Sequence, residues 1–323
     1  MLRASPVNAV VEAHELHKSF GANHAVDGVS LHVDPGEAYG LVGPDGAGKT
    51  TTLRLIVAAL HADRGSVSIL GHDVAREPEQ ARAQIGYLAQ RFSLYGDLTV
   101  LENLRFFAQV RGMGGARLAD RARQLLGFVG LDGVEGRRAD ALSGGMKQKL
   151  GLACALVHEP PVLLLDEPTA GVDPITRQDF WQLIIRVLGQ GTAVIVSTPY
   201  MDEAARCTRI GFMHSGRILV EGAPRRLTAS LEGRVLELAA HPKQRAAEIA
   251  RSDPGVEDVI EFGDRLHLRV AEASGPLERL PAALAAAGVD VARLRQVAPS
   301  MEDVFISLLA GQAASAAVHE GAT

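Results

Sequence analysis

The stretch from Gly43 to Thr50 constrains this chain more than any other. It reads Gly-Pro-Asp-Gly-Ala-Gly-Lys-Thr, and a glycine, four residues and then Gly-Lys-Ser/Thr is the pattern of a phosphate-binding P-loop. Residues 37–42 before it are typical of a short strand, and residues 51–56 after it are typical of the first turns of a helix. The motif therefore lies between a strand and a helix, which is the context that its role requires.

The residue types of this loop predict how it would hold a nucleotide. Its glycines have no Cβ, so backbone N–H groups can approach a phosphate, and the helix that begins near Lys49 adds its positive N-terminal end. Lys49 would reach the β- and γ-phosphates, and Thr50 could place its hydroxyl on Mg²⁺. A glycine-rich turn without a ligand is the alternative, which the complete spacing disfavours. The candidate nucleotide-binding residues of the loop are Gly43, Pro44, Asp45, Gly46, Ala47, Gly48, Lys49, Thr50 and Thr51.

Composition limits the classes of protein to consider. The chain has 323 residues and a net charge of −5, which allows a large and a small domain and gives no reason to expect a nucleic-acid partner. Its two cysteines, Cys154 and Cys207, have no metal-ligand spacing and are expected to be buried thiols. The N-terminus lacks the apolar run of a signal peptide, and we find no stretch of about 18 apolar residues that would predict a membrane span.

Strands and helices alternate over much of the chain, which predicts an α/β domain with a mainly parallel sheet. We place this domain at residues 11–230, after a leader at 1–10, with an antiparallel pair of strands first and a helix-rich part at about 91–160. Two continuous apolar runs, Val162–Leu165 and Ala193–Ser197, are typical of strands that are buried on both faces.

The composition changes after Pro224. Residues 231–310 follow a β-α-β-β-α-β order, which predicts a small, separate α+β domain. We expect its second helix over 280–287, with Pro281 in the first turn. A last short helix is expected over 301–309, followed by a disordered tail at 311–323 that is rich in alanine, glycine and serine.

Two carboxylates, Asp166 and Glu167, end the first buried strand. Ligands of α/β sheets bind at the carboxyl ends of the strands. Asp166 is therefore a candidate ligand of Mg²⁺, and Glu167 is a candidate general base for an attacking water. The alternative is that the strand ends in solvent and the two carboxylates bind no ligand. The P-loop in the same chain disfavours this alternative.

A second glycine-rich helix start lies at Leu142–Gln148 and contains Ser143, Gly144 and Gly145. A serine hydroxyl, two glycine N–H groups and a helix N-terminus can together bind an anion. Since a P-loop already wraps its phosphates, such a second cradle makes sense if it closes over the nucleotide of another chain. A capped helix start without a ligand is the alternative.

Taken together, these motifs resemble the ATP-binding subunit of an ABC transporter over about residues 11–230. In this resemblance Gly43–Thr50 is the Walker A motif, Leu142–Gln148 is the signature and Val162–Glu167 is the Walker B motif. Residues 170–173 match the D-loop, and Gln90 matches the Q-loop residue. Phe20 matches the aromatic residue that stacks on adenine, and Val26 would pack nearby.

The resemblance implies a P-loop NTPase fold of the ABC ATPase type and a head-to-tail dimer that binds ATP and Mg²⁺. Each ATP would lie between the P-loop of one chain and Ser143, Gly144 and Gly145 of the other, and Asp173 would cross the interface. Gln90 would act with Glu167 in catalysis and contact the metal ion.

The resemblance also implies an integral membrane permease as a partner, at the cytoplasmic face of the membrane. The region after Gln90, with Phe92, Leu94 and Tyr95, is where such subunits meet that partner. Residues 299–305 read Pro-Ser-Met-Glu-Asp-Val-Phe, which resembles the ending of ATPase subunits that export drugs and antibiotics. Export of a drug-like, antibiotic or lipid-like substrate is therefore the expected function.

One position departs from the pattern of this family. Pro199 stands where the family has its switch histidine, and proline cannot donate a hydrogen bond. Two hypotheses follow: either Glu167 suffices and the chain hydrolyses ATP slowly, or the chain is a nucleotide-gated module with little turnover. A soluble ABC protein that acts on ribosomes or DNA is a further alternative, which the single Walker A motif disfavours.

Overall fold

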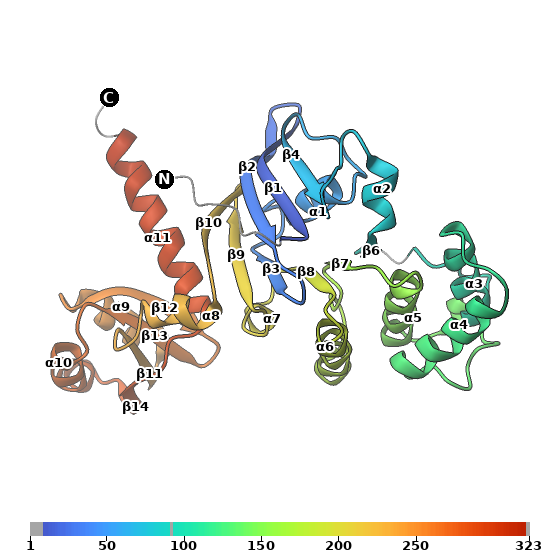
Figure 1. Cartoon of the computed structure of the whole chain (residues 1–323). Coiled ribbons are helices and arrows are strands. Elements are labelled where there is room, and N and C mark those ends of the chain that lie inside the picture. Colours follow the sequence, from blue (N-terminus) through green and yellow to red (C-terminus); the bar gives the residue numbers. More distant parts are fainter. Residues whose placement is uncertain (1–8, 91–92, 321–323) are drawn as a thin grey trace. The chain divides into compact units, whose positions relative to one another are not determined.

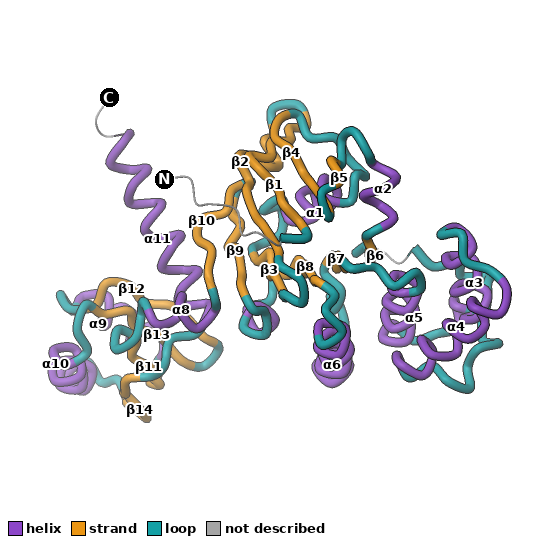
Figure 2. The backbone as a smooth tube through the Cα atoms, in the orientation of Figure 1, coloured by secondary structure: helices purple, strands orange, loops and turns teal. Residues whose placement is uncertain are grey.

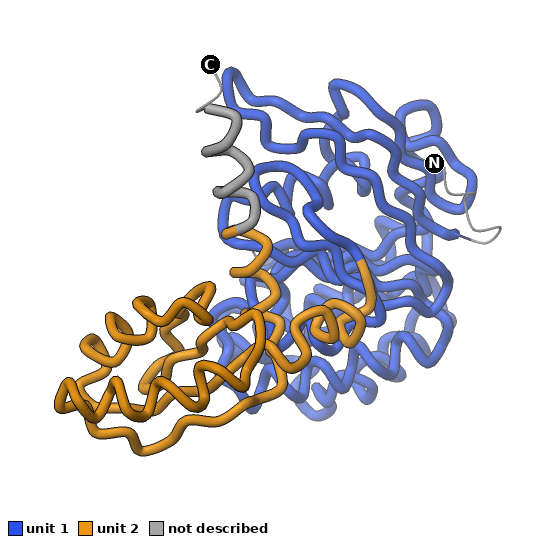
Figure 3. Tube along the Cα trace, turned by 90° about the vertical axis from the view of Figure 1, so that its left-hand side faces the viewer, with its two compact units in different colours: residues 1–221 blue, residues 222–323 orange. Residues whose placement is uncertain are grey.

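The computed structural model describes residues 9–90 and 93–320. The chain divides into two compact units, residues 1–221 and 222–323 (Figure 3). The division lies before the boundary at residue 230 that the sequence indicated, because helix α8 (Pro224–Ala229) contacts α11 (Met301–Glu320) of the second unit.

A six-stranded sheet forms the centre of the first unit, and its strands from β9 to β6 run parallel (Figure 1). In spatial order the strands are β10 (Arg217–Gly222), β9 (Arg209–His214), β3 (Ala38–Val42), β8 (Ala193–Thr198), β7 (Val162–Asp166) and β6 (Ile85–Leu88). Every residue of β3, β7 and β8 is buried, and for β7 and β8 this confirms what the continuous apolar runs predicted. The P-loop follows β3, and Asp166 ends β7, so both lie at the same edge of the sheet.

A second, antiparallel sheet has four strands in the order β2-β1-β4-β5. They are β2 (Asn23–Val33), β1 (Val11–Phe20), β4 (Arg64–Ile69) and β5 (His72–Asp73). The first two strands extend to a tight turn at residues 21–22, beyond the ends at Leu16 and Val29 that the sequence indicated. Register shifts on either side of His17 interrupt the alternation of apolar and polar residues, which is why the pattern did not reveal these ends.

Some helices of the first unit form a group of their own (Figure 2). Three of them, α3 to α5, lie together beside the six-stranded sheet and form the predicted helical part. Helix α3 begins with a capping box, because Thr99 Oγ1 accepts from the Glu102 N–H at 3.2 Å while the Thr99 N–H donates to Glu102 at 2.8 Å. The helices are α1 (Lys49–Ile56), α2 (Pro78–Ala83), α3 (Val100–Val110), α4 (Gly115–Val129), α5 (Gly144–Leu156), α6 (Pro174–Leu188) and α7 (Met201–Ala204), with a 3₁₀ turn at Ala139–Ala141.

The second unit has the predicted β-α-β-β-α-β order. Its antiparallel sheet, β12-β13-β11-β14, is accompanied by α9 and α10, and Leu236, Leu268 and Leu280 lie in their shared core. The elements are β11 (Val235–His241), α9 (Lys243–Ser252), β12 (Val256–Phe262), β13 (Arg265–Val270), α10 (Ser274–Ala286) and β14 (Asp290–Gln296).

Helix α10 begins at Ser274, so Pro281 lies in the helix interior and not in the first turn as the sequence indicated. The pyrrolidine ring removes one helical hydrogen bond, and the ring is exposed. Its neighbours Leu280 and Leu284 are fully buried. The burial of this apolar stripe favours a continuous helix in spite of the proline.

Helix α11 starts at the motif of residues 299–305 and continues to Glu320. The disordered tail expected over 311–323 is therefore wrong for residues 311–320, and residues 321–323 lie outside the described residues. Alanine is the strongest helix former, and residues 311–320 contain four alanines, so the composition that suggested disorder also favours a helix. Residues 1–8 of the expected leader likewise lie outside the described residues, whereas Val10 already donates to the Val33 carbonyl of β2.

Candidate nucleotide-binding site

The loop between β3 and α1 has the backbone of a phosphate cradle. Gly46 and Gly48 have φ of 78° and 106°, in the left-handed region that side chains disfavour. A Cβ on Gly48 would lie 2.2 Å from the Ala25 carbonyl oxygen, and a Cβ on Gly43 would lie 2.1 Å from that of Met213. The first and last glycines of the loop are therefore required by packing within the chain, and Gly46 is required by its backbone angle.

Lys49, the first residue of α1, carries the positive charge of the site. Its side chain is only 3% exposed, and Nζ donates to the carbonyl oxygens of Gly43 at 2.9 Å and Pro44 at 3.0 Å. Nζ also lies 3.3 Å from Oε1 of Glu167. The lysine that the sequence assigned to the phosphates and the glutamate that it assigned to catalysis therefore share one site.

Asp166 is held by hydroxyl groups from three directions. Its Oδ1 accepts from the hydroxyls of Thr50 at 2.9 Å and Ser197 at 2.7 Å, and its Oδ2 accepts from Tyr87 at 3.3 Å. Burial and then the negative charge of Asp166 raise the pKa of Tyr87 to about 12, so the phenol is protonated and donates at neutral pH. The pairing of Thr50 with Asp166 is the one that the sequence predicted for a shared Mg²⁺.

Ser197 and Tyr87 were not found from the sequence. Ser197 is the strand partner of Asp166 across the parallel pair β7–β8, and Tyr87 lies on β6, on the other side of β7. A polar residue at the end of an apolar run was the available signal for Ser197, but the register that brings it to Asp166 is a property of the fold.

Glu167 has an unusual backbone and two side-chain partners. Its φ is 47°, and its N–H is shared by the carbonyl oxygen of Ser197 at 3.1 Å and the hydroxyl of Ser197 at 3.0 Å. Its Oε2 accepts from Nε2 of Gln90 at 2.7 Å, while Oε1 faces Lys49. Gln90 thus lies beside the candidate base, as expected.

A cavity of about 330 Å³ lies beside the P-loop, Gln90 and Glu167. Its walls are formed by Phe20, Asn23, Ala25, Asp45, Gly46, Gly48, Lys49, Thr50, Thr51, Gln90 and Glu167. Phe20 is 50% exposed, which leaves a ring face free for a flat ligand. Val26, which the sequence assigned to the base, is buried in the core, and its neighbour Ala25 lines the cavity, because side chains alternate along β2.

The donor set fits a nucleotide with a divalent cation. Backbone N–H groups, a buried lysine and a helix N-terminus suit phosphates, and the Thr50 hydroxyl beside the Asp166 carboxylate suits Mg²⁺. Within the described ranges there is no group of three or more His, Cys, Asp or Glu that could hold a metal. Mg²⁺ bound here would therefore need ligands from phosphates and water, which is how this ion is usually bound.

The second glycine-rich helix start lies elsewhere in the first unit. Ser143 caps α5, with its Oγ accepting from the Met146 N–H at 3.3 Å, and a Cβ on Gly144 would meet open space. A Cβ on Gly145 would lie 2.5 Å from Thr176 Cγ2 in the first turn of α6. Asp173 caps α6 by accepting from the Thr176 N–H at 3.0 Å. In the part of the chain that the structure describes, these signature and D-loop residues do not line the P-loop cavity.

The segment around Pro199 offers no side-chain donor at the switch position. The Thr198 carbonyl accepts from the Gly43 N–H at 3.3 Å, so the segment touches the P-loop through its backbone. The Thr198 hydroxyl donates to the buried Glu203 at 2.6 Å, and Thr169 donates to the other oxygen of that carboxylate. The hydroxyl groups of Thr198 and Thr169 are therefore committed to Glu203.

Comparisons with known proteins agree with this geometry. Residues 26–170 match the family model described as ABC transporter, and residues 222–309 match that of the ATP-binding protein DrrA1-3-like, C-terminal domain. The chain is 39% identical over 303 residues to the Nod factor export ATP-binding protein I of Paraburkholderia xenovorans, covering 93% of this chain and 97% of the relative. The chain belongs to the ABC transporter family. The resemblance that its motifs carried is thereby confirmed.

Two further relatives are ATP-binding proteins by name. The chain is 39% identical over 312 residues to the probable multidrug ABC transporter ATP-binding protein YbhF of Escherichia coli, covering 95% of this chain but 53% of that relative, about half of its length. It is 38% identical over 251 residues to the daunorubicin/doxorubicin resistance ATP-binding protein DrrA of Streptomyces peucetius, covering 77% and 76%.

Solved structures confirm the ABC ATPase fold of the first unit. An ATP-binding subunit of an ABC transporter is 31% identical with a TM-score of 0.63, covering 69% of this chain and 93% of its own. A dimeric ATP-binding cassette in a post-hydrolysis state with ADP and Pi is 28% identical with a TM-score of 0.61, covering 66% and 98%.

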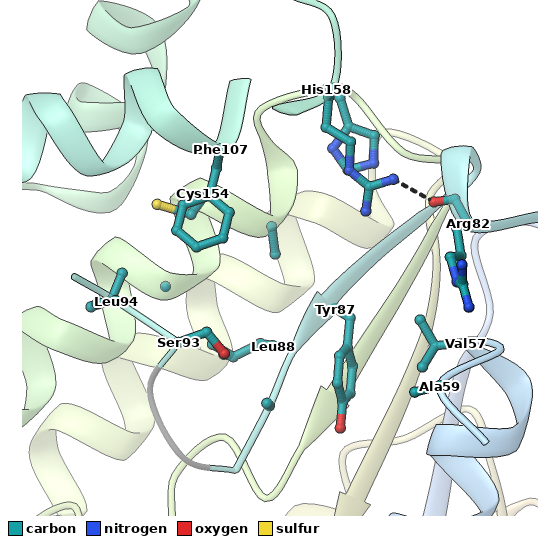
Figure 4. Close-up of a pocket in the computed structure, with 14 residues that line it drawn as sticks. Val57, Ala59, Arg82, Tyr87, Leu88, Ser93, Leu94, Phe107, Cys154 and His158 are labelled. Carbon is teal, nitrogen blue, oxygen red and sulfur yellow. Dashed lines mark hydrogen bonds between the residues drawn. The ribbon is translucent and has the colours of Figure 1, made fainter. Parts of the chain in front are cut away.

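This ABC ATPase unit has a second, larger cavity of about 470 Å³ (Figure 4). Val57 and Ala59 line it on one side, Leu94 and Phe107 on the other, and the ring of Tyr87 lies between them. Leu94 is one of the residues expected to meet a membrane partner. Phe92 lies outside the described residues, and Tyr95 is 48% exposed and packs edge-on against Phe106 at 4.6 Å between ring centroids.

His158 and Cys154, which line this cavity beside the charged Arg82 and Arg111, are neutral at pH 7. Burial and the positive charge of Arg111 lower the pKa of His158 to about 4. Burial raises the pKa of the Cys154 thiol, and burial together with the charge of Glu203 raises the pKa of Cys207 to about 12. Both cysteines are buried and unpaired, as the sequence predicted.

None of the helices in the described ranges combines the length and the apolar character that a membrane span requires.

Proposed function

We propose that this chain binds and hydrolyses ATP and thereby energises export of a drug-like, antibiotic or lipid-like substrate through a separate integral membrane permease. The observation that carries the proposal is that Lys49, Thr50 and Glu167 line one cavity, where the Thr50 hydroxyl donates to Asp166. A cation for phosphates, a carboxylate with a hydroxyl for Mg²⁺, and a second carboxylate are the parts that phosphoryl transfer to water needs.

Each residue has a role that follows from its contacts. The P-loop N–H groups and Lys49 hold the phosphates, and Thr50 with Asp166 holds Mg²⁺, which neutralises phosphate charge when bound. Glu167 takes a proton from the attacking water. Gln90 donates to Glu167 at 2.7 Å and keeps that carboxylate directed at the cavity.

The active unit in this proposal is a dimer of two ABC ATPase chains, alike or different. Ser143 and Gly144 present a capped helix start with open space in front of it, and they lie outside the cavity of their own P-loop. A second chain would bring its Ser143, Gly144 and Gly145 to the phosphates at this P-loop. Asp173, at the exposed start of α6, would lie at the same interface.

The partner in the membrane is proposed from the apolar cavity that Leu94 and Phe107 line and from the family of the relatives. Docking there would place the chain at the cytoplasmic face of the membrane. The names of the relatives, which include Nod factor export and daunorubicin/doxorubicin resistance, support export as the direction of transport.

Pro199 supports a second candidate, a nucleotide-gated module with little turnover. The position has no N–H and no polar side chain, and the neighbouring Thr198 hydroxyl is occupied by Glu203. By analogy with other preorganised donors, the loss of one hydrogen-bond donor from a catalytic site lowers turnover by about 10²–10³.

ATPase measurements on the purified chain distinguish the two candidates. We expect wild-type turnover clearly above that of Glu167→Gln, and an increase of about tenfold or more in Pro199→His. Wild-type turnover equal to that of Glu167→Gln, with ATP binding retained, would instead support the gated module. Recovery of an integral membrane protein with the tagged chain from detergent-solubilised membranes tests the permease, and recovery of ribosomes or DNA would contradict it.

A further inference from the structure

We propose that Ser197 is a positioning residue that sets the geometry of both acidic groups of the site, Asp166 and Glu167. The inference rests on the proposed function, since it names a residue that would act through the metal-holding carboxylate and the general base. Ser197 lies at the carboxyl end of β8, is fully buried and is the strand partner of Asp166.

The direction of each hydrogen bond at Ser197 is fixed by chemistry. An ionised carboxylate only accepts, so the single hydroxyl proton of Ser197 is donated to Asp166 Oδ1 at 2.7 Å. A backbone N–H only donates, so the Ser197 oxygen accepts from Glu167 N at 3.0 Å. One buried hydroxyl thus bridges the two neighbouring acidic residues.

The contact to Asp166 differs in kind from that of Thr50. Both hydroxyls donate to the same Oδ1, but Thr50 is itself a candidate ligand of Mg²⁺. Ser197 lies on the neighbouring strand and remains available to hold the carboxylate. It therefore fixes the rotamer of Asp166 through a charge-assisted hydrogen bond, which is stronger than a neutral one.

The contact to Glu167 holds a backbone that is costly for a residue with a side chain. A left-handed conformation costs roughly 1–2 kcal/mol in such residues, and Glu167 has φ of 47°. Its N–H points at Ser197, where the carbonyl at 3.1 Å and the hydroxyl at 3.0 Å share the proton. The serine side chain therefore stabilises the turn that directs the candidate base into the cavity.

The neighbours of Ser197 do not supply this contact. The hydroxyl of Thr198 donates to Glu203, and Pro199 has no donor. Among residues 197–199, the side-chain hydrogen bonds to Asp166 and Glu167 are therefore made by Ser197.

A purely structural role for Ser197 makes a different prediction. If the hydroxyl only satisfies buried polar groups, its removal lowers stability, and activity changes only as far as folding does. If it positions the carboxylates, its removal also changes the Mg²⁺ dependence of nucleotide binding and the turnover of correctly folded protein.

The test uses the full chain with Ser197→Ala, with Ser197→Thr, which keeps the hydroxyl, and with Ile195→Val as a matched control. Ile195 is buried in the apolar core on the same face of β8. Loss of one methylene there gives a destabilisation comparable to that of a small buried polar group. For each variant we would measure thermal stability, kcat and KM, and ATP affinity with and without Mg²⁺.

We expect Ser197→Ala to lower kcat by about tenfold and to reduce the gain in ATP affinity that Mg²⁺ gives, with affinity in the absence of Mg²⁺ within about twofold of wild type. Ser197→Thr should recover most of both losses. The proposal is overturned if Ser197→Ala matches Ile195→Val in kcat and in Mg²⁺ dependence. If wild-type turnover is no higher than that of Glu167→Gln, the proposed function fails, and the Mg²⁺ dependence of binding still decides for or against Ser197.

Discussion

Two glycine-rich helix starts of the first unit, Gly43–Thr50 and Ser143–Gly145, offer the same backbone device but are built differently. The P-loop is closed on itself, because Lys49 bonds two of its carbonyl oxygens and Gly48 packs against the Ala25 carbonyl. The signature start has one cap bond, from Met146 N to Ser143 Oγ, and an open space at Gly144.

The difference shows that one chain can contain an anion site with charged partners of its own and a second helix start without them. The P-loop has its counter-charges within reach, with Lys49 at 3.3 Å from Glu167 and Thr50 at 2.9 Å from Asp166. In the described residues around the signature, the cap is made but no cation or carboxylate of the P-loop cavity is adjacent. We attribute this difference to the dimer proposed above.

The largest effect should separate nucleotide affinity from turnover at the two starts. We expect Lys49→Ala to weaken ATP binding by about 10- to 100-fold, since it removes a charged hydrogen-bond donor from the phosphates. Ser143→Ala should leave binding within about twofold and lower ATPase turnover by about tenfold or more. Titration with a fluorescent ATP analogue and steady-state ATPase assays give both numbers. Equal loss of affinity in the two variants would break the comparison.

The next effect concerns glycine itself. Gly48→Ala should destabilise the first unit by several kcal/mol, because the new methyl would lie 2.2 Å from a backbone oxygen at a φ of 106°. Gly144→Ala has room and an ordinary φ, so its stability should match wild type or rise by roughly 0.5 kcal/mol. Thermal unfolding of both variants checks this. A stable Gly48→Ala protein that binds ATP would contradict the packing argument.

The third effect tests whether Gly145 of the signature packs closely against Thr176 of α6. Gly145→Ala should lose about 1–3 kcal/mol through a clash with Thr176, because the new methyl would lie 2.5 Å from Thr176 Cγ2. Adding Thr176→Ser removes the threonine methyl group and should restore most of the loss. A double-mutant cycle by chemical denaturation measures the coupling. Additive effects would show that the two residues do not share this space.

The smallest effect compares Ser143 with a third helix start, which is completed within its own unit. At α11 the Ser300 N–H and hydroxyl donate to Asp303 Oδ2 at 2.7 and 2.8 Å, and His267 Nδ1 lies 2.9 Å from Oδ1. Burial raises the pKa of Asp303, but hydrogen bonds from His267 and Ser300 outweigh it and hold the pKa below its ordinary value. The stabilisation is therefore present above the ordinary carboxyl pKa and is lost as the pH falls through the lowered pKa.

Thermal unfolding of the second unit between pH 7 and pH 2 checks this prediction. Wild type should lose stability at the acid end, and Asp303→Asn should be less stable at pH 7 and show a flatter acid limb. A mutant with the same acid limb as wild type would show that other carboxylates account for it.

The sequence predicted most elements of the fold where local chemistry decides them. Ser143 caps a helix, as one of the two interpretations expected, and the apolar runs Val162–Leu165 and Ala193–Ser197 lie in the buried strands β7 and β8. The ends of β1 and β2 were missed because register shifts hide the alternation. The sequence analysis placed Pro281 in the first turn of its helix and expected the alanine-rich end of α11 to be disordered. Both predictions were wrong because they rested on local composition, which suggested a shorter helix.

For the candidate site, the motif residues were predictable and their supporting contacts were not. Lys49, Thr50, Asp166 and Glu167 follow from motif spacing and are brought together. The bonds from Ser197 and Tyr87 to Asp166 depend on which strands are neighbours in the sheet and in what register. A single sequence contains the strands but does not state their spatial order.

The left-handed backbone of Glu167 has a consequence for how this protein can be altered. Glycine would adopt a φ of 47° without the penalty that glutamate carries, roughly 1–3 kcal/mol for a strained residue at a functional site. Selection for thermal tolerance alone would therefore reward the replacement of the residue that turnover needs. At position 167, the stability of the fold favours glycine, whereas ATPase turnover favours glutamate.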